Sequence, residues 1–366
     1  MSSAFIEPHC GRPALVIPPF DDGGGRTLIV MRIDAPPPYS TRGYRGRADH
    51  PAMARLLTAH NTTADSSDGS LVTPQQIDND YATRTPETLA NDFLIIEHPD
   101  DGPVAYVRCG VDDTPEGRSH FLIGPVDPDH MRRPLYLAIL AGAEARARER
   151  VAADGRCEYG PDFLRTWLTH PGPDTTPRDC APAWAEEAGM RAVRFGASMV
   201  RPDLENILDV PLPDGVEIRP VEPPHLRAIF DANNDAFRGH FGEQEIKEDD
   251  WRRFCENPDL DLTLWRVAWS GDTVVGQVRS YINADENALH HRSRGYTEFI
   301  STHPDYRGKG IASALLSASL HAIRDRGMTE AALGVDTQNP ANALAIYQRM
   351  GFVVTGFDSV YDKVLD

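Results

Sequence analysis

The chain has 366 residues, of which 40% are hydrophobic and 25% are charged, and its formal net charge is −18. This length suits two domains, and the composition is that of a globular protein. The acidity argues against nucleic acid as a partner, because a phosphate backbone favours a basic surface. No stretch approaches the ~20 apolar residues that a membrane helix needs, so we expect no membrane partner either.

The cysteines and the N-terminus indicate the compartment. The five cysteines are scattered and form no CxxC pair. This pattern indicates neither a disulfide framework nor a zinc site, and we expect no bound metal. The first residues lack the basic stretch and apolar core of a secretion signal. Together with free thiols, this predicts a cytoplasmic protein.

Breaker residues divide the chain into parts. Residues 1–50 are rich in proline and glycine and predict an irregular N-terminal extension. A second breaker region predicts a linker over 201–215, between one domain at 51–200 and another at 216–366. In the second domain, strand and helix patterns alternate. Strands are expected at 216–219, 263–269, 273–278, 296–302, 331–335 and near Tyr361, and helices at 224–237, 247–256, 312–326 and after Asn339. The order predicts an α/β fold with a mixed sheet.

The run from His303 to Ala312, HPDYRGKGIA, lies between a predicted strand and a predicted helix. Gly308 and Gly310 allow the backbone to approach an anion closely and to adopt positive φ. The unpaired N–H groups of the first helical turn and the helix dipole favour negative charge there. The pattern therefore predicts an anion-binding loop. The alternative is an ordinary strand–turn–helix connection without a ligand.

The spacing Arg307-x-x-Gly310-x-Ala312 resembles the acetyl-CoA pyrophosphate loop of the GNAT superfamily of N-acetyltransferases. Further on, an Asn-initiated helix that carries Tyr347 and ends in Gly-Phe resembles the second signature of that family. The resemblance implies a GNAT fold from about residue 216 to the end of the chain. It also implies acetyl-CoA as the acetyl donor.

A weaker copy of the same pattern lies upstream. Aligning Pro128 with Pro304 places residues 131–134, MRRP, opposite residues 307–310, the glycine loop. Aligning Gly189 with Gly351 places Ala185 opposite Tyr347. The chain thus resembles the mycothiol synthase-like acetyltransferases, with two tandem GNAT folds of which the N-terminal one is degenerate. This duplication lets one chain imitate a GNAT dimer, so we expect a monomer.

The degenerate copy offers one further possibility, which is a silent donor site built on Arg132 and Arg133. Pro134 argues against it, because proline lacks the N–H that the loop would donate.

The family resemblance implies catalytic roles for two residues. Tyr347 would donate a proton to the leaving thiolate, and Glu298 would remove a proton from the amine through water. His240 is a rival base in the loop after the first helix of the second domain. Each residue also has a structural alternative: a packed tyrosine ring, a solvent-facing strand carboxylate and a surface histidine.

The resemblance implies two sets of binding residues. Donor binding would use backbone N–H groups that polarise the thioester carbonyl or hold the pyrophosphate, and asparagine side chains that bond the pantetheine or the phosphate end of the cofactor. The residues are Ile300, Thr302, Arg307, Gly308, Lys309, Gly310, Ile311, Ala312, Ser313, Asn339 and Asn342. As an N-cap, Asn339 also has a structural role. The acceptor pocket would use aromatic side chains and one histidine, namely Phe237, His240, Trp251 and Tyr361.

We therefore expect an acetyl-CoA-dependent N-acetyltransferase that acts on the primary amine of a small molecule by direct attack in the C-terminal domain. Three alternatives stay open. They are mycothiol synthase-like acetylation of a cysteinyl amino-sugar, acetylation of a protein or peptide, and CoA binding without turnover. The sequence does not choose the acceptor among them.

Overall fold

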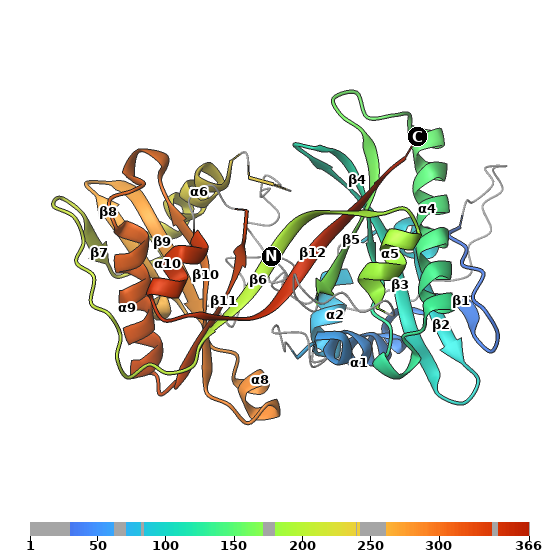
Figure 1. Cartoon of the computed structure of the whole chain (residues 1–366), viewed down its shortest axis with the longest axis horizontal. Helices are drawn as coiled ribbons and strands as arrows, with labels where there is room; N and C mark the ends of the chain where they lie inside the picture. The colour runs from blue at the N-terminus through green and yellow to red at the C-terminus, as the bar shows by residue number, and fades with distance from the viewer. Residues whose placement is uncertain are drawn as a thin grey trace. The chain divides into compact units, whose positions relative to one another are not determined.

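A computed structural model describes residues 30–61, 71–81, 84–170, 180–238, 240–241, 261–338 and 343–365 (Figure 1). They form two compact units. The N-terminal unit takes its described residues from 30–61, 72–193 and 359–365, and the C-terminal unit takes its own from 71 and 194–358. In the part of the chain described, no helix is both long and apolar enough to cross a membrane.

The N-terminal unit is a mixed sheet with helices on both faces. Its strand order is β1-β2-β3-β4-β5, followed by the end of β12, and the β4–β5 pair is parallel. The elements are β1 (Ser40–Gly43), η2 (Gly46–Ala48), α1 (His50–Asn61), α2 (Pro74–Tyr81), α3 (Pro86–Asp92), β2 (Phe93–His98), β3 (Gly102–Thr114), β4 (Gly117–Ile123), η3 (Pro128–His130), α4 (Arg133–Asp154), β5 (Asp162–His170) and α5 (Ala181–Glu187).

Strand alternation explains why this sheet is covered on both sides. Along β3, Ala105 and Val107 join the apolar cluster that contains Ile139 of α4. Tyr106 between them joins the cluster of Met53 from α1. Successive side chains of a strand point to opposite faces, so one buried strand serves two cores.

The C-terminal unit repeats this plan. Its strand order is β7-β8-β9-β10-β11-β6, and only the β10–β11 pair among these is parallel. The elements are β6 (Arg191–Arg201), β7 (Glu217–Arg219), η4 (Pro223–His225), α6 (Leu226–Phe237), η5 (Leu262–Leu264), β8 (Arg266–Ser270), β9 (Thr273–Tyr281), α8 (Ala284–Leu289), β10 (Arg294–Thr302), η6 (Pro304–Tyr306), α9 (Ile311–Asp325), β11 (Glu330–Asp336), α10 (Ala343–Arg349) and β12 (Val353–Val364).

Helices α6 and α9 cover opposite faces of this second sheet. Val267 of β8 packs in the cluster of Ile229 from α6. Its neighbour Ala268 packs in the cluster of Leu315 from α9. The mixed α/β architecture predicted from the sequence is therefore confirmed.

Two strands cross between the units. Part of β6, the last strand of the first half of the sequence, belongs to the C-terminal unit, and part of β12, the last strand of the second half, belongs to the N-terminal unit. Residues 194–201 of β6 belong to the C-terminal unit and pair antiparallel with β11, from Gly196↔Asp336 to Arg201↔Ala331. Residues 359–364 of β12 belong to the N-terminal unit. The division therefore falls at 193/194 and 358/359, and not within the linker expected at 201–215, because strand pairing crosses the halves of the sequence.

The segment expected as a linker is packed onto the C-terminal unit. Leu204 is 3% exposed and joins the cluster of Leu316 and Leu320 from α9. Arg201 donates to the carbonyl oxygens of Asp203 at 2.8 Å and Asn206 at 2.7 Å. Apolar burial and these hydrogen bonds hold the segment in one conformation.

Part of the expected N-terminal extension also belongs to a core. Residues 1–29 lie outside the described residues, as does the helix expected at 247–256. Met31 and Ile33, however, are 2% and 4% exposed in the main cluster of the N-terminal unit. The amide of Met31 donates to the carbonyl of Asn91 at 2.9 Å.

The packing of α9 predicts a stability difference between two leucine truncations. Leu320→Ala removes a side chain that is 0% exposed, and its cavity should lower the free energy of unfolding by about 2–5 kcal/mol. Leu289→Ala on α8, where the leucine is 46% exposed, is the matched control and should change it by less than about 0.5 kcal/mol. Urea unfolding followed by circular dichroism measures both. Equal losses would contradict the packing.

Candidate active site

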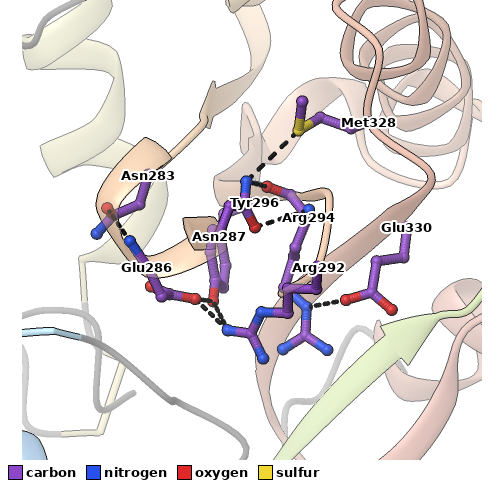
Figure 2. A network of polar contacts seen from close by, with 8 residues as sticks. All are labelled: Asn283, Glu286, Asn287, Arg292, Arg294, Tyr296, Met328 and Glu330. Atoms are coloured by element: carbon purple, nitrogen blue, oxygen red, sulfur yellow. Dashed lines mark hydrogen bonds and ion pairs between the residues drawn. The ribbon is translucent and has the colours of Figure 1, made fainter. Parts of the chain in front are cut away.

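A polar network fixes the start of β10 to β11 (Figure 2). Arg294 Nε donates to Glu330 Oε1 at 2.7 Å, which joins the two strands directly. The side-chain amide of Asn287 on α8 bonds both the N–H and the carbonyl of Arg294, each at 2.9 Å. Buried Glu286 accepts from Arg292 and from the Tyr296 hydroxyl. These contacts tie α8 and Arg292 to the start of the strand pair.

The two strands separate beyond this network. Parallel pairing runs from Arg294↔Glu330 to Tyr296↔Ala332, although β10 continues to residue 302 and β11 to 336. On its other side, β10 stays paired with β9 but shifts register between residues 298 and 301. Phe299 in this bulge has φ of 48° and is 40% exposed. Bulges often lie next to active sites because they redirect the strand and its side chains.

The separated end of β10 leads directly into the glycine loop. After the short helix η6, Gly308 and Gly310 have φ of 76° and 82°, in the region that glycine favours. Gly310 is the N-cap of α9, and no side chain caps this terminus. A Cβ built on either glycine would meet nothing within 4 Å. The loop therefore combines uncapped helical N–H groups with open space, which suits an anion.

The two cations of the loop have partners within the protein. Arg307 Nη2 donates to the carbonyl of Ala236 in α6 at 3.1 Å, so this side chain ties the loop to α6. Lys309 Nζ lies 4.6 Å from the ring centroid of Tyr306. His303 Nδ1 accepts from the amide of Asp305 at 3.3 Å and stabilises η6. The loop is thus held in shape on both sides of its first glycine.

Tyr347 and Glu298 approach the separated strands from opposite faces of the sheet. Tyr347 on α10 is 6% exposed and packs in the cluster of Leu316 and Leu320, on the α9 face. Glu298 faces the α6 side, because its partner on β9 is Arg279, which is linked through Gln277 to α6. Burial raises the pKa of the Tyr347 phenol, and the charge of Glu298 raises it further. The phenol therefore stays protonated at neutral pH and close enough to Glu298 for the charge to act.

Arg279 is a site residue that the sequence analysis missed. It is the direct partner of Glu298 on β9, so both side chains project to one face of the sheet. Its Nε donates to Gln277 Oε1 at 2.8 Å, and Gln277 Nε2 donates to the carbonyl of Ile229 in α6. Its guanidinium lies 4.7 Å from the Phe299 ring centroid. Burial lowers the pKa of Arg279. The sequence did contain a sign of this residue, because an arginine is unusual in a strand as apolar as β9.

The residues expected in the acceptor pocket are only partly brought together. The rings of Phe237 and His240 are 5.2 Å apart, and the His240 amide donates to the Phe237 carbonyl at 2.9 Å. The adjacent Phe241 ring lies 5.1 Å from the guanidinium of Arg194, which pairs with Asp336 at the end of β11. The loop after α6 thus reaches the end of the separated strand.

Four of the expected binding residues are not placed at this site. Trp251, Asn339 and Asn342 lie outside the described residues. Tyr361 is 1% exposed in the core of the N-terminal unit, in one cluster with Tyr136. The structure therefore corrects the expectation for Tyr361: the strand exchange carries this part of β12 into the N-terminal unit, where the ring is a core residue.

The corresponding region of the N-terminal unit has a different geometry. Helix α4 begins after Arg132, whose φ is −130°, and proline occupies its first turn. Arg133 Nε donates to Glu187 Oε2 at 2.8 Å. Ala185, which aligns with Tyr347, is 0% exposed. In the N-terminal unit, Arg132 thus stands in place of the left-handed glycine that caps α9, and Ala185 stands in place of the Tyr347 phenol.

Comparison with known proteins identifies the family. Residues 226–352 match the acetyltransferase (GNAT) family. The mycothiol acetyltransferase of Thermomonospora curvata is 28% identical over 85% of this chain and 92% of its own length. That of Saccharopolyspora erythraea is 30% identical over 62% of this chain and 71% of its own. The chain belongs to the GNAT acetyltransferase family and is an acyltransferase.

Solved structures confirm the tandem fold. A GCN5-related N-acetyltransferase from Sphaerobacter thermophilus superposes with a TM-score of 0.65 at 22% identity, covering 90% of this chain and 96% of that one. A tandem GNAT protein from the clavulanic acid biosynthesis pathway gives 0.61 at 15% identity, with 89% and 98% covered. At these identities the likeness concerns the fold alone.

Proposed function

We propose that the C-terminal unit transfers an acetyl group from acetyl-CoA to the primary amine of a small molecule. The observation that carries the proposal is the end of β10–β11 pairing beside an uncapped, glycine-initiated α9. This arrangement supports a donor that lies between the separated strands, with its pyrophosphate at the helix N-terminus.

The loop has the properties that a pyrophosphate needs. The N–H groups of Ile311, Ala312 and Ser313 belong to the first turn of α9 and have no partner within the helix. The open space at Gly308 and Gly310 admits phosphate oxygens against the backbone. Arg307 acts in this proposal mainly by holding the loop to Ala236.

The chemistry follows from the groups around the separated strands. The amine nitrogen attacks the thioester carbonyl, and backbone N–H groups of β10 near Ile300 and Thr302 stabilise the oxyanion. The C–S bond then breaks, and Tyr347 donates its proton to the departing thiolate. Its raised pKa means that the phenol still holds this proton when it is needed. Solvent returns a proton to the phenolate after the product leaves.

Glu298 is the proposed base. Its carboxylate lies on the strand segment that borders the separation, and its charge acts on Tyr347. A water molecule would carry the amine proton to it, since the amine must be neutral to attack. Arg279 stands directly opposite on β9. His240 remains the rival base.

The acceptor class rests on the relatives. Matches to mycothiol acetyltransferases extend over 85% of this chain, which favours a mycothiol synthase-like acceptor, a cysteinyl amino-sugar, over a protein or peptide. The duplicated fold within one chain supports a monomer. Retention of Tyr347 and of both loop glycines argues against donor binding without turnover.

Two glycines at opposite ends of α9 test donor binding. Gly310 and Gly327 have φ of 82° and 83°, so alanine at either should cost about 1–2 kcal/mol of stability. Only Gly310→Ala should also weaken acetyl-CoA binding, by roughly 10-fold, the effect of losing one hydrogen bond to a charged group. Isothermal titration calorimetry measures both variants.

The wild-type protein should bind one equivalent of acetyl-CoA in the same titration. Two equivalents would show that the N-terminal unit also holds donor, and equal weakening by both glycine variants would contradict the loop assignment.

Tyr347→Phe tests the proton donor. Thiol release is first measured for the wild type with cysteinyl amino-sugars, aminoglycosides, polyamines and peptides, and the best acceptor is used. The variant should lose roughly 100- to 10,000-fold in kcat while its Kd for acetyl-CoA is unchanged, because phenylalanine keeps the packing and removes the proton. An unchanged kcat would exclude the role. A wild type inactive with every acceptor would favour the non-catalytic alternative.

Glu298→Gln distinguishes the two bases. At neutral pH it should lower kcat/KM by roughly 100- to 10,000-fold. The loss should shrink as the pH rises, because the amine then deprotonates in solution. Glu217→Gln, an exposed carboxylate on β7, is the control and should leave the pH profile unchanged. If His240→Ala shows the loss and Glu298→Gln does not, the base is His240.

A further inference from the structure

Three metal-ligating side chains converge in the N-terminal unit, at a place that the proposed function does not use. We call them the His–Asp–His cluster: His98 at the end of β2, Asp101 in the turn before β3, and His130 at the end of η3. Their ligand atoms all lie within 4.8 Å of one another. The cluster joins a hairpin turn to the loop that follows β4.

The distances suit a small cation. Asp101 Oδ2 lies 2.9 Å from His98 Nδ1 and 3.2 Å from His130 Nε2. In tetrahedral zinc sites with bonds of about 2.0–2.1 Å, neighbouring ligand atoms lie roughly 3.3 Å apart. Asp101 Oδ2 thus lies about as far from each nitrogen as two ligands of one ion do, and the two nitrogens lie within 4.8 Å of each other.

A fourth residue orients one of the imidazoles. Tyr39 Oη lies 3.2 Å from His130 Nδ1, on the side of the ring away from Asp101. If Nδ1–H donates to Tyr39, the Nε2 lone pair is left for a metal, which is the usual second-shell arrangement of a ligating histidine. The amide of Asp100 approaches His98 Nδ1 at 3.4 Å, a long contact that a metal would replace.

The exposure of the cluster is also that of a metal site with an open position. The side chains of His98 and His130 are 18% and 14% exposed, whereas that of Asp101 is 55% exposed. Without a metal, ion pairs this exposed contribute about 0–1 kcal/mol. The ring centroids of the two imidazoles lie 4.9 Å apart, so both rings stand at the same place on the surface of the unit.

We propose that the N-terminal unit binds one Zn²⁺ ion through His98 Nδ1, Asp101 Oδ2 and His130 Nε2, with water in the fourth position. Two imidazoles and a carboxylate are common zinc ligands. We expected no metal because of the cysteine spacing. That spacing gives no information about a site made of two histidines and an aspartate.

The C-terminal unit lacks both histidines at the matching places, although Asp272 precedes β9 as Asp101 precedes β3. Ser270 ends β8 where His98 ends β2, and Tyr306 stands where η3 has His130. The zinc ion would thus hold the loop after β4 in place in the N-terminal unit, where that loop is not the proposed donor site. Its role would be structural, in the unit without the glycine loop.

Zinc binding by the full-length, untagged chain tests the proposal. After equilibrium dialysis against micromolar ZnCl₂, mass spectrometry of the metal should find one zinc per wild-type chain. His98→Ala and His130→Ala should each abolish this binding. Tyr39→Phe should weaken it by roughly 10-fold, the effect of losing a second-shell partner. His321→Ala is the matched control, because His321 Nε2 pairs with Asp209 at 2.8 Å without a third ligand; it should bind as the wild type does.

Two further measurements keep the result decisive. Circular dichroism of each variant without metal shows whether it is folded, so lost binding is not confused with unfolding. Cobalt(II) in place of zinc should give visible absorption bands in the wild type that vanish in the His98→Ala, His130→Ala double variant. Absence of stoichiometric zinc in the wild type, or equal zinc in the double variant, would overturn the proposal.

Discussion

The parallel pairing of β10 with β11, and its early end, is the constraint on which the candidate site depends. Arg294 and Glu330 hold the strands together at one end, where the buried network leaves no choice of register. Beyond Tyr296 the bulge at Phe299 turns β10 away. The separation leaves the end of β10, which leads into the glycine loop, without β11 as a partner. A continuous ladder would have used those backbone groups for the sheet itself.

The N-terminal unit has the same kind of strand pairing without the glycine loop. Its parallel pair β4–β5 also begins with a basic and an acidic residue opposite each other, Arg118 and Asp162, and His120 Nε2 donates to the same carboxylate at 3.0 Å. Yet Ala185 replaces the phenol. The pairing and the apolar faces thus build both sheets, whereas the two units differ in a few loop and helix residues.

The exchange of terminal strands makes the two units interdependent. Part of β6 completes the sheet that holds the candidate site, and part of β12 returns to the N-terminal unit, where Leu365 bonds the carbonyl of Asp162 at 2.8 Å. The last strand of the first half of the sequence therefore borders β11. If the N-terminal unit binds zinc, the ion would stabilise the fold of that unit.

The sequence by itself determined what depends on neighbouring residues. The helix expected at 312–326 forms at 311–325, and Gly310 adopts the left-handed conformation, because periodicity and glycine turns are local properties. It also predicted the family from two motifs. Only the tertiary structure decided what depends on distant pairing. It placed Arg279 opposite Glu298, moved Tyr361 into another core and set the unit boundaries, since strand order and register arise from contacts between segments far apart in the chain.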